Sequence, residues 1–457
     1  MSGYALLVPE LLVLVGVAWA LFAERLPGGD RGAAVVGAGL ALVAAVIAGM
    51  SPVTESLFTG WLAFDGAARF GRAGIALLVA VWLLWTAGRG EGRIREAVAL
   101  SLLSSLGAML MCGANELVTL VLTLELSTMP AYVLIGYRRN RPAGLEGALK
   151  YFLLSMLTSL VMLYGLSFLY GISGSTRFDA LDISSGGSLG LLAVLLTFVG
   201  MFAKLSAAPF HYWTPDAYEG AESWSVAFVS TVPKVAGAVA LVRLTAALAP
   251  SAPFLGTLLL GVAVASMVLG NLAALTQHDV RRMMAYSGVA HTGYLLLAAA
   301  SLSPEGSGAA VFYALAYALP SLGIMLFVAE EGSLVDDFAG LSQRRMAAAW
   351  GVVVLLVSLI GIPPAIGFFG KLSLFSAALS AGFSVWVGVA VLMSVVSAGY
   401  YLRIIRAAFL TDGEETSVSV PSASPVASAA VALCVLATVG LGLAAGPLLE
   451  WMGPLGF

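Results

Sequence analysis

The sequence predicts an all-α integral membrane protein with about fourteen transmembrane helices. Of its 457 residues, 60% are hydrophobic and only 10% are charged, and its mean hydropathy is +0.98. These values lie far outside the range of soluble globular domains. The apolar runs are long enough to cross roughly 30 Å of hydrocarbon, and short polar loops separate them. This pattern indicates a helical bundle and not a β-barrel.

The predicted spans follow one another along the whole chain and are each about 17 to 25 residues long. They centre near residues 14, 42, 78, 104, 126, 160, 198, 236, 264, 293, 320, 360, 396 and 437. We divide the chain into 1–95 (spans one to three), 96–250 (spans four to eight), 251–410 (spans nine to thirteen) and 411–457 (a loop and the last span). The two middle segments are expected to be inverted repeats of each other.

The arginines test this count, because basic residues gather on the cytoplasmic loops of membrane proteins. All of them are expected to flank the spans. They fall after the odd-numbered spans: Arg25, Arg31, Arg89, Arg93, Arg95, Arg138, Arg139, Arg141, Arg281, Arg282, Arg344, Arg345, Arg403 and Arg406. The even loops hold only Arg177, beside two aspartates. The alternation predicts that both termini lie on the outer face.

Two predicted spans contain an internal break. Span seven carries AKLSAAPF, and span twelve carries GIPPAIGFFGK. Proline removes a backbone donor, so unwound backbone at membrane depth is tolerated only where protein or a water-filled cavity surrounds it. Paired breaks in two halves of a hydrophobic chain are typical of transporters built from inverted repeats. The alternative is that both breaks are ordinary proline kinks.

Lysine has an unusual distribution in this chain. There are only four lysines, and each lies in or at the end of an apolar segment: Lys150, Lys204, Lys234 and Lys371. A charge at mid-bilayer costs about 2.5 to 3.5 kcal/mol, so such side chains face the bundle interior and have partners. Arginine stays protonated in proteins, whereas a buried lysine can lose its proton. The distribution therefore favours a role in which the basic group titrates.

Glu125 is the only acid deep within the early spans. A carboxylate about 4 Å from a lysine favours the protonated lysine by roughly 4 kcal/mol at an effective dielectric near 20, against about 2.4 kcal/mol at about 7 Å. A Glu125–Lys204 pair would thus act as a proton switch driven by small movements. The alternative for Lys204 and Lys234 is a satisfied ion pair that fixes helix register.

For other charged residues near span ends, the sequence leaves both a structural and a functional role open. Lys150 follows Glu146 by four residues at a span end, where a snorkelling, locally paired lysine is expected as readily as a functional one. Glu10 also lies near a span end, so its role is equally open. Lys371 comes just after the second break, where a titratable group could serve proton exit.

The three histidines differ in context. His278 belongs to the polar loop TQHDVRR. His291, inside span ten, is either a hydrogen-bonded packing residue or a proton relay. His211 lies beside the break in span seven, and a relay role is favoured because histidine titrates near pH 6.5.

Cys112 and Cys434 are too far apart for a metal-binding spacing, and no Gly-rich nucleotide motif follows a strand pattern.

Several long motifs make the sequence similar to a known family. They are LELSTMPAYVLIGYRRN, APFHYWTPDAYEG, TVPKVA, NLAALTQHDVRRMMAYSGVAHTGY and GIPPAIGFFGK. From about Glu125 to Phe409 the chain resembles the subunit N family of the proton-pumping NADH:quinone oxidoreductases, respiratory complex I. One departure is visible: after DAYEG the family usually shows a proline-containing run, and here the chain reads AESWSV, which leaves the geometry of that loop open.

The resemblance implies a fourteen-helix, antiporter-like subunit in the membrane arm of a complex in the bacterial cell (inner) membrane. By motif it implies proton-translocating roles for Glu125, Lys204, Lys234 and Lys371, with His211 and His291 along the same hydrophilic axis. NADH, FMN, iron–sulfur clusters and quinone would be held by partner subunits, with none in this chain. The expected partners are other membrane-arm subunits, the lipid bilayer and protons, and no nucleic acid.

Two rival functions use the same fold and many of the same residues. One is an Mrp-type cation/proton antiporter subunit that works without electron transfer. The other is the membrane subunit of a related hydrogenase or of a ferredoxin- or F420-linked dehydrogenase. The HYWTPDAYEG form favours the quinone-linked complex.

Overall fold

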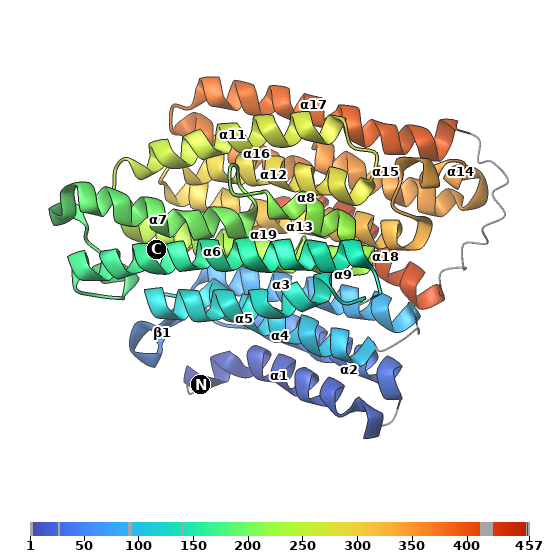
Figure 1. Ribbon diagram of the computed structural model, residues 1–457, viewed down its shortest axis with the longest axis horizontal. Helices are drawn as coiled ribbons and strands as arrows, with labels where there is room; N and C mark the ends of the chain where they lie inside the picture. Colours follow the sequence, from blue (N-terminus) through green and yellow to red (C-terminus); the bar gives the residue numbers. More distant parts are fainter. Residues whose placement is uncertain are drawn as a thin grey trace.

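The protein is a bundle of long helices that run roughly side by side, as a computed structural model shows (Figure 1). The structure describes residues 3–25, 28–89, 94–138, 140–411, 424–453 and 455. Arg93, Arg139 and part of the predicted C-terminal loop (412–423) lie outside the described residues.

The described chain is almost entirely helical. The first helices are α1 (Val8–Leu21), α2 (Gly29–Met50), α3 (Gly66–Arg89), α4 (Ile94–Gly113), α5 (Leu117–Ile135), α6 (Pro142–Ser173) and α7 (Gly187–Leu205). They are followed by α8 (Trp213–Gly220), α9 (Ser223–Val229), α10 (Val232–Leu248), α11 (Leu255–Leu275), α12 (Val280–Ala299) and α13 (Pro304–Glu331). The last are α14 (Leu341–Arg344), α15 (Met346–Ile360), α16 (Ile366–Ser380), α17 (Ser384–Leu410), α18 (Pro425–Leu443) and α19 (Ala445–Met452). Strands β1 (Thr54–Leu57) and β2 (Leu62–Phe64) form one antiparallel hairpin.

The predicted spans are confirmed as membrane-type helices. Among the described residues, twelve helices are long and apolar enough to cross a membrane. The two predicted spans missing from that set have physical explanations. Span ten is α12, which carries polar residues but is buried along nearly its whole length, and span twelve is split into the shorter apolar helices α15 and α16.

Polar residues at the ends of the apolar runs start several helices. Glu116 accepts a hydrogen bond from the backbone of Thr119 at the start of α5, and Asp279 caps α12 in the same way. Ser303 caps α13, which also has a proline in its first turn. Side-chain caps satisfy backbone donors that no helix can satisfy itself. These caps set where each helix begins.

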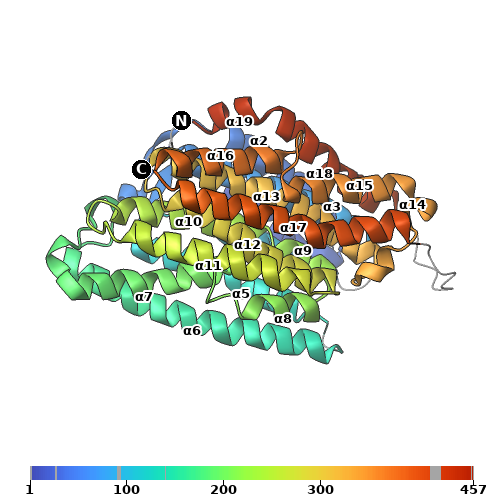
Figure 2. The ribbon, with the colours of Figure 1, turned by 90° about the horizontal axis from the view of Figure 1, so that it is seen from above.

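Two helices form the centre of the bundle. The apolar segments of α9–α10 and of α13 are fully enclosed by protein, whereas most of the corresponding segment of α6 faces outward. Helix α13 packs against α10, α12, α16 and α3. In the view from above, the central helices lie between α6 and α7 on one side and α18 and α19 on the other (Figure 2). A lysine placed on α10 is therefore remote from lipid.

Both predicted breaks are present. The chain leaves α7 at Leu205 and re-enters helix at Trp213, and it leaves α15 at Ile360 and re-enters helix at Ile366. Ser206 and Gly361 have left-handed backbone at these points, with φ of 60° and 93°. Each break falls in the fourth span of a predicted five-span repeat. Unwound segments of this kind are more than kinks, because each separates two helices.

The N- and C-termini lie on the same side of the bundle in both views (Figures 1 and 2). This agrees with an even number of crossings. The AESWSV segment (221–226), whose geometry the sequence left open, leads into α9, and its Glu222, the residue before the helix, pairs with Arg141.

The expectation that every arginine flanks a span is wrong for two residues. Arg72 lies within α3 and Arg243 within α10, and both are buried. Each is paired with a carboxylate: Arg72 with Glu10 at 2.7 Å, and Arg243 with Asp65 at 2.5 Å. An ion pair with satisfied hydrogen bonds allows a guanidinium to stay inside the bundle.

Candidate functional site

Lys204 lies in the last turn of α7, directly before the first break, and its side chain is buried. Its Nζ donates a 2.9 Å hydrogen bond to the Thr128 hydroxyl on α5. Glu125, one turn earlier on α5, interacts electrostatically with this ammonium group but is not in direct contact with it. The predicted pair is thus brought together across α5 and α7 in a separated arrangement.

Glu125 is partly buried on α5. Its Oε1 accepts a 2.6 Å hydrogen bond from the Ser159 hydroxyl on α6, and its Oε2 is buried with no partner in the described part of the chain. A carboxylate oxygen without a partner in a buried place is costly. Glu125 is therefore poised to accept another donor.

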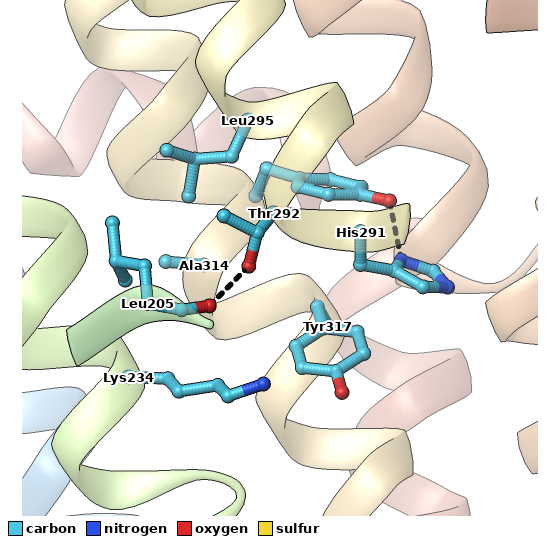
Figure 3. Close-up of a pocket in the computed structure, with 8 residues that line it drawn as sticks. Leu205, Lys234, His291, Thr292, Leu295, Ala314 and Tyr317 are labelled. Carbon is cyan, nitrogen blue, oxygen red and sulfur yellow. Dashed lines mark hydrogen bonds between the residues drawn. The ribbon is translucent and has the colours of Figure 1, made fainter. Parts of the chain in front are cut away.

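Lys234 lies in the first turn of α10, at the centre of the bundle. Its Nζ is buried and has no hydrogen-bond partner within the described residues, and it lies 5.9 Å from the ring centres of both Tyr218 and Tyr317. Figure 3 shows the side chain extending toward Tyr317 on α13. The aromatic faces offer the ammonium group partial compensation for lost hydration.

A small cavity of about 20 Å³ lies between Lys234 and His291 (Figure 3). Its other polar lining includes Thr292 and the hydroxyl-bearing rings of Tyr313 and Tyr317. A cavity of roughly 10 to 15 Å³ on this measure holds one water when polar partners are present. The space therefore suits a single water between the lysine and the histidine.

His291 lies in the middle of α12 and is hydrogen-bonded at both ring nitrogens. Nδ1 is 2.6 Å from the Tyr313 hydroxyl, and Nε2 is 3.3 Å from the Tyr401 hydroxyl, which in turn contacts Ser287. The imidazole interacts electrostatically with both Lys234 and Lys371. It is thus placed between the two lysines of the two halves.

Lys371 lies on α16, just after the second break, and is buried. Its Nζ donates to the carbonyl oxygens of Leu359 and Ile360 at 3.0 and 2.8 Å and to the Ser394 hydroxyl at 2.7 Å. Those carbonyls form the C-terminal end of α15, where the helix dipole favours a cation. The break in span twelve therefore creates the binding site for this ammonium group.

His211 lies in the first break and is buried, with Nδ1 lacking a partner within the described residues. Its ring neighbours are Tyr212 and Tyr286. The structure does not bring His211 into contact with Lys204 or Lys234.

Lys150 is half-exposed and forms ion pairs with Glu146 and Asp216, both at 2.7 Å, as expected for a locally paired lysine.

Sequence reasoning missed the hydroxyl groups that contact the charged residues. They are Thr128, Ser159, Tyr313, Ser394 and Tyr401. Serine, threonine and tyrosine are common in membrane helices, so one sequence gives no signal for those that point at a lysine. The available clue is spacing, since Thr128 follows Glu125 by three residues and therefore shares its helix face.

The sequence that carries this site matches a known protein family. Residues 114–397 match the family model described as NADH:quinone oxidoreductase/Mrp antiporter, TM. The matched residues include both breaks and all six candidate residues. The chain belongs to this family. The matched region covers both predicted repeats nearly completely, so the family resemblance extends beyond a single motif.

Individual relatives agree. The chain is 36% identical over 464 residues to NADH-quinone oxidoreductase subunit N 2 of Solidesulfovibrio magneticus, covering 98% of each chain. It is 40% identical over 331 residues to the subunit N 2 of Syntrophobacter fumaroxidans, covering 70% of each. A chain of respiratory complex I from Thermus thermophilus has the same fold, with a TM-score of 0.84 and 32% identity over 97% of this chain and 98% of that one.

The fold alone is also shared with the Mrp complex from Dietzia sp. DQ12-45-1b. There the TM-score is 0.86, the identity 21%, and the coverage 100% of this chain and 97% of the other. The architecture is thus shared with chains of both complexes, whereas the sequence identities of 36 to 40% are to proteins named subunit N.

Proposed function

We propose that this chain is a proton-translocating membrane-arm subunit of a respiratory NADH:quinone oxidoreductase. The observation that carries the proposal is the buried row of titratable groups on helices α5, α7, α10, α12 and α16, within a fold shared with complex I. The curated relatives named subunit N, at 36 to 40% identity, support the quinone-linked complex as its setting.

The proposed route passes protons along this row. Charge displacement elsewhere in the complex changes the Glu125–Lys204 separation and with it the hold of Lys204 on its proton. The proton then moves to Lys234, across the cavity to His291, and on to Lys371 for release. Support for the second half of the route comes from the cavity that Lys234 and His291 both line. His211, beside the first break, belongs to the entry region in this proposal.

We assign no redox group to this chain. NADH, FMN, iron–sulfur clusters and quinone would be held by partner subunits, and the chain's role is translocase without electron transfer of its own. The spacing of Cys112 on α4 and Cys434 on α18 supports this assignment. The arginine distribution supports placing both termini on the outer face of a bacterial inner membrane.

Inverted membrane vesicles carrying Lys204→Ala test the proposal. NADH:quinone electron transfer and proton uptake are recorded together, with assembly of the complex checked by native gel. Loss of both activities in an assembled complex is the expected result, because pumping and electron transfer are tightly coupled. Unchanged electron transfer with loss of Na⁺-dependent proton exchange would instead show an antiporter subunit and refute the quinone-linked assignment.

A further inference from the structure

We propose that two hydroxyl groups, those of Thr128 and Ser159, hold the Glu125–Lys204 pair apart and act as positioning residues for the switch. The inference rests on the proposed function, since it concerns how the same lysine is controlled. It assigns a role to residues on α5 and α6 that carry no charge themselves.

The contacts on the two sides of the pair are alike. Lys204 Nζ has the Thr128 Oγ1 as its acceptor at 2.9 Å, and Glu125 Oε1 has the Ser159 hydroxyl as its donor at 2.6 Å. Each charged group is therefore bonded to a neutral hydroxyl and not to the opposite charge. The second carboxylate oxygen is buried and free of partners within the described residues, so a site for the ammonium group is available.

The Thr128 hydroxyl is fixed in the orientation that accepts from lysine. It donates its own proton to the backbone carbonyl of Leu124, one turn earlier on α5, so its lone pairs point away from that turn. Thr128 is fully buried, and water cannot readily replace it. An Oγ with its proton engaged can offer Lys204 only an acceptor.

Exchange of partners would close the switch. A hydrogen bond between an ion and a neutral hydroxyl is weaker than an ion pair at the same distance in a low-dielectric site. When Lys204 leaves Thr128 for Glu125 Oε2, its protonated form is stabilised. When it returns to Thr128, that stabilisation is lost and the proton can move on. Glu125 is a charged group that acts electrostatically on Lys204 in the described structure.

Removing either hydroxyl should bias the pair toward contact. We expect Thr128→Val, which has nearly the same shape, and Ser159→Ala to shift the pH profile of NADH:quinone turnover to higher pH by about one unit, since 4 Å and 7 Å separations differ by that much. Thr128→Ser keeps the hydroxyl and should restore the wild-type profile. A merely structural threonine would change the amount of assembled complex without moving the profile.

A matched control lies next to Ser159. Within the described residues, the Thr158 hydroxyl bonds to the carbonyls of Leu154 and Ser155 in its own helix, so Thr158→Val should leave the profile unchanged. All variants are measured in the intact complex in inverted vesicles, beside Lys204→Ala. If Thr128→Val prevents assembly, Ser159→Ala decides.

Wild-type pH profiles for both Thr128→Val and Ser159→Ala, with Lys204→Ala inactive, would overturn the positioning role and leave the proposed function standing. A shift to lower pH would also overturn it, because the hydroxyls would then stabilise the protonated lysine more than the carboxylate does. Full pumping by Lys204→Ala would instead refute the proposed function itself.

Discussion

At the scale of single residues, each buried lysine has a different kind of neighbour. In the described part of the chain, Lys204 bonds to a hydroxyl, Lys371 bonds to two helix-end carbonyls and a hydroxyl, and Lys234 faces the rings of Tyr218 and Tyr317. Desolvation disfavours a charged amine, and the three environments offset that cost to different degrees. Lys234 has the least compensation, which suits a group that passes a proton on quickly.

Gly288 on α12 makes room for Lys234, and its replacement should interrupt the route. A Cβ at this position would lie 2.6 Å from the Lys234 Nζ and 2.9 Å from the Tyr317 hydroxyl. We expect Gly288→Ala to displace the flexible end of Lys234 and so to lower coupled turnover by about tenfold, since misplacing a reacting group by about 1 Å can cost up to about 100-fold in rate. Gly261→Ala on α11, where a Cβ meets nothing within 4 Å, is the control and should be silent. Equal activity of both variants would mean that Lys234 tolerates displacement.

At the scale of elements, one buried ion pair joins α1 to α3, and another joins the start of α3 to α10. Glu10 on α1 binds Arg72 on α3 through two 2.7 Å hydrogen bonds, and Asp65 before α3 binds Arg243 on α10. All four side chains are buried. These pairs lie apart from the lysine row and fix how helices pack.

Breaking one of these pairs should destabilise the subunit strongly. Arg72→Ala leaves the Glu10 carboxylate buried without its partner, which costs about 3 to 5 kcal/mol. A lower thermal stability of the purified complex, with less subunit in the membrane, is expected. The double variant Glu10→Gln, Arg72→Met should recover much of the loss because no charge remains unpaired. A stable Arg72→Ala complex would show that water reaches Glu10.

A second network of charges links α6, α8 and α12 at one end of the bundle. Partial burial raises the pKa of Asp216, but hydrogen bonds from Lys150 and Arg282 outweigh it, so the pKa lies below its ordinary value. A carboxyl with a lowered pKa stabilises the fold above its ordinary pKa and loses that contribution as pH falls through the folded-state value.

The stability difference between wild type and Asp216→Asn should therefore be constant from about pH 5 to 8 and shrink below about pH 4. Thermal unfolding monitored across that range measures it. A difference that grows on acidification would contradict the assigned interactions.

At the scale of the whole molecule, sequence alone predicted the span count, both breaks and the burial of Lys204, Lys234 and Lys371. These features could be predicted because hydropathy and proline act locally. Contacts between distant spans could not be predicted in the same way. The prediction that Arg72 and Arg243 flank a span was wrong because their carboxylate partners lie 62 and 178 residues away in the chain. The separated Glu125–Lys204 geometry depends on hydroxyls whose orientation only the packed bundle fixes.

In the proposed function Lys204 works by releasing its proton, and the variant Lys204→Arg removes that ability. Arginine keeps the positive charge and the hydrogen-bonding capacity but does not deprotonate in proteins. In inverted vesicles with an assembled complex, we expect proton uptake driven by NADH oxidation to be lost in this variant. Proton uptake at the wild-type rate would show that Lys204 does not need to release its proton.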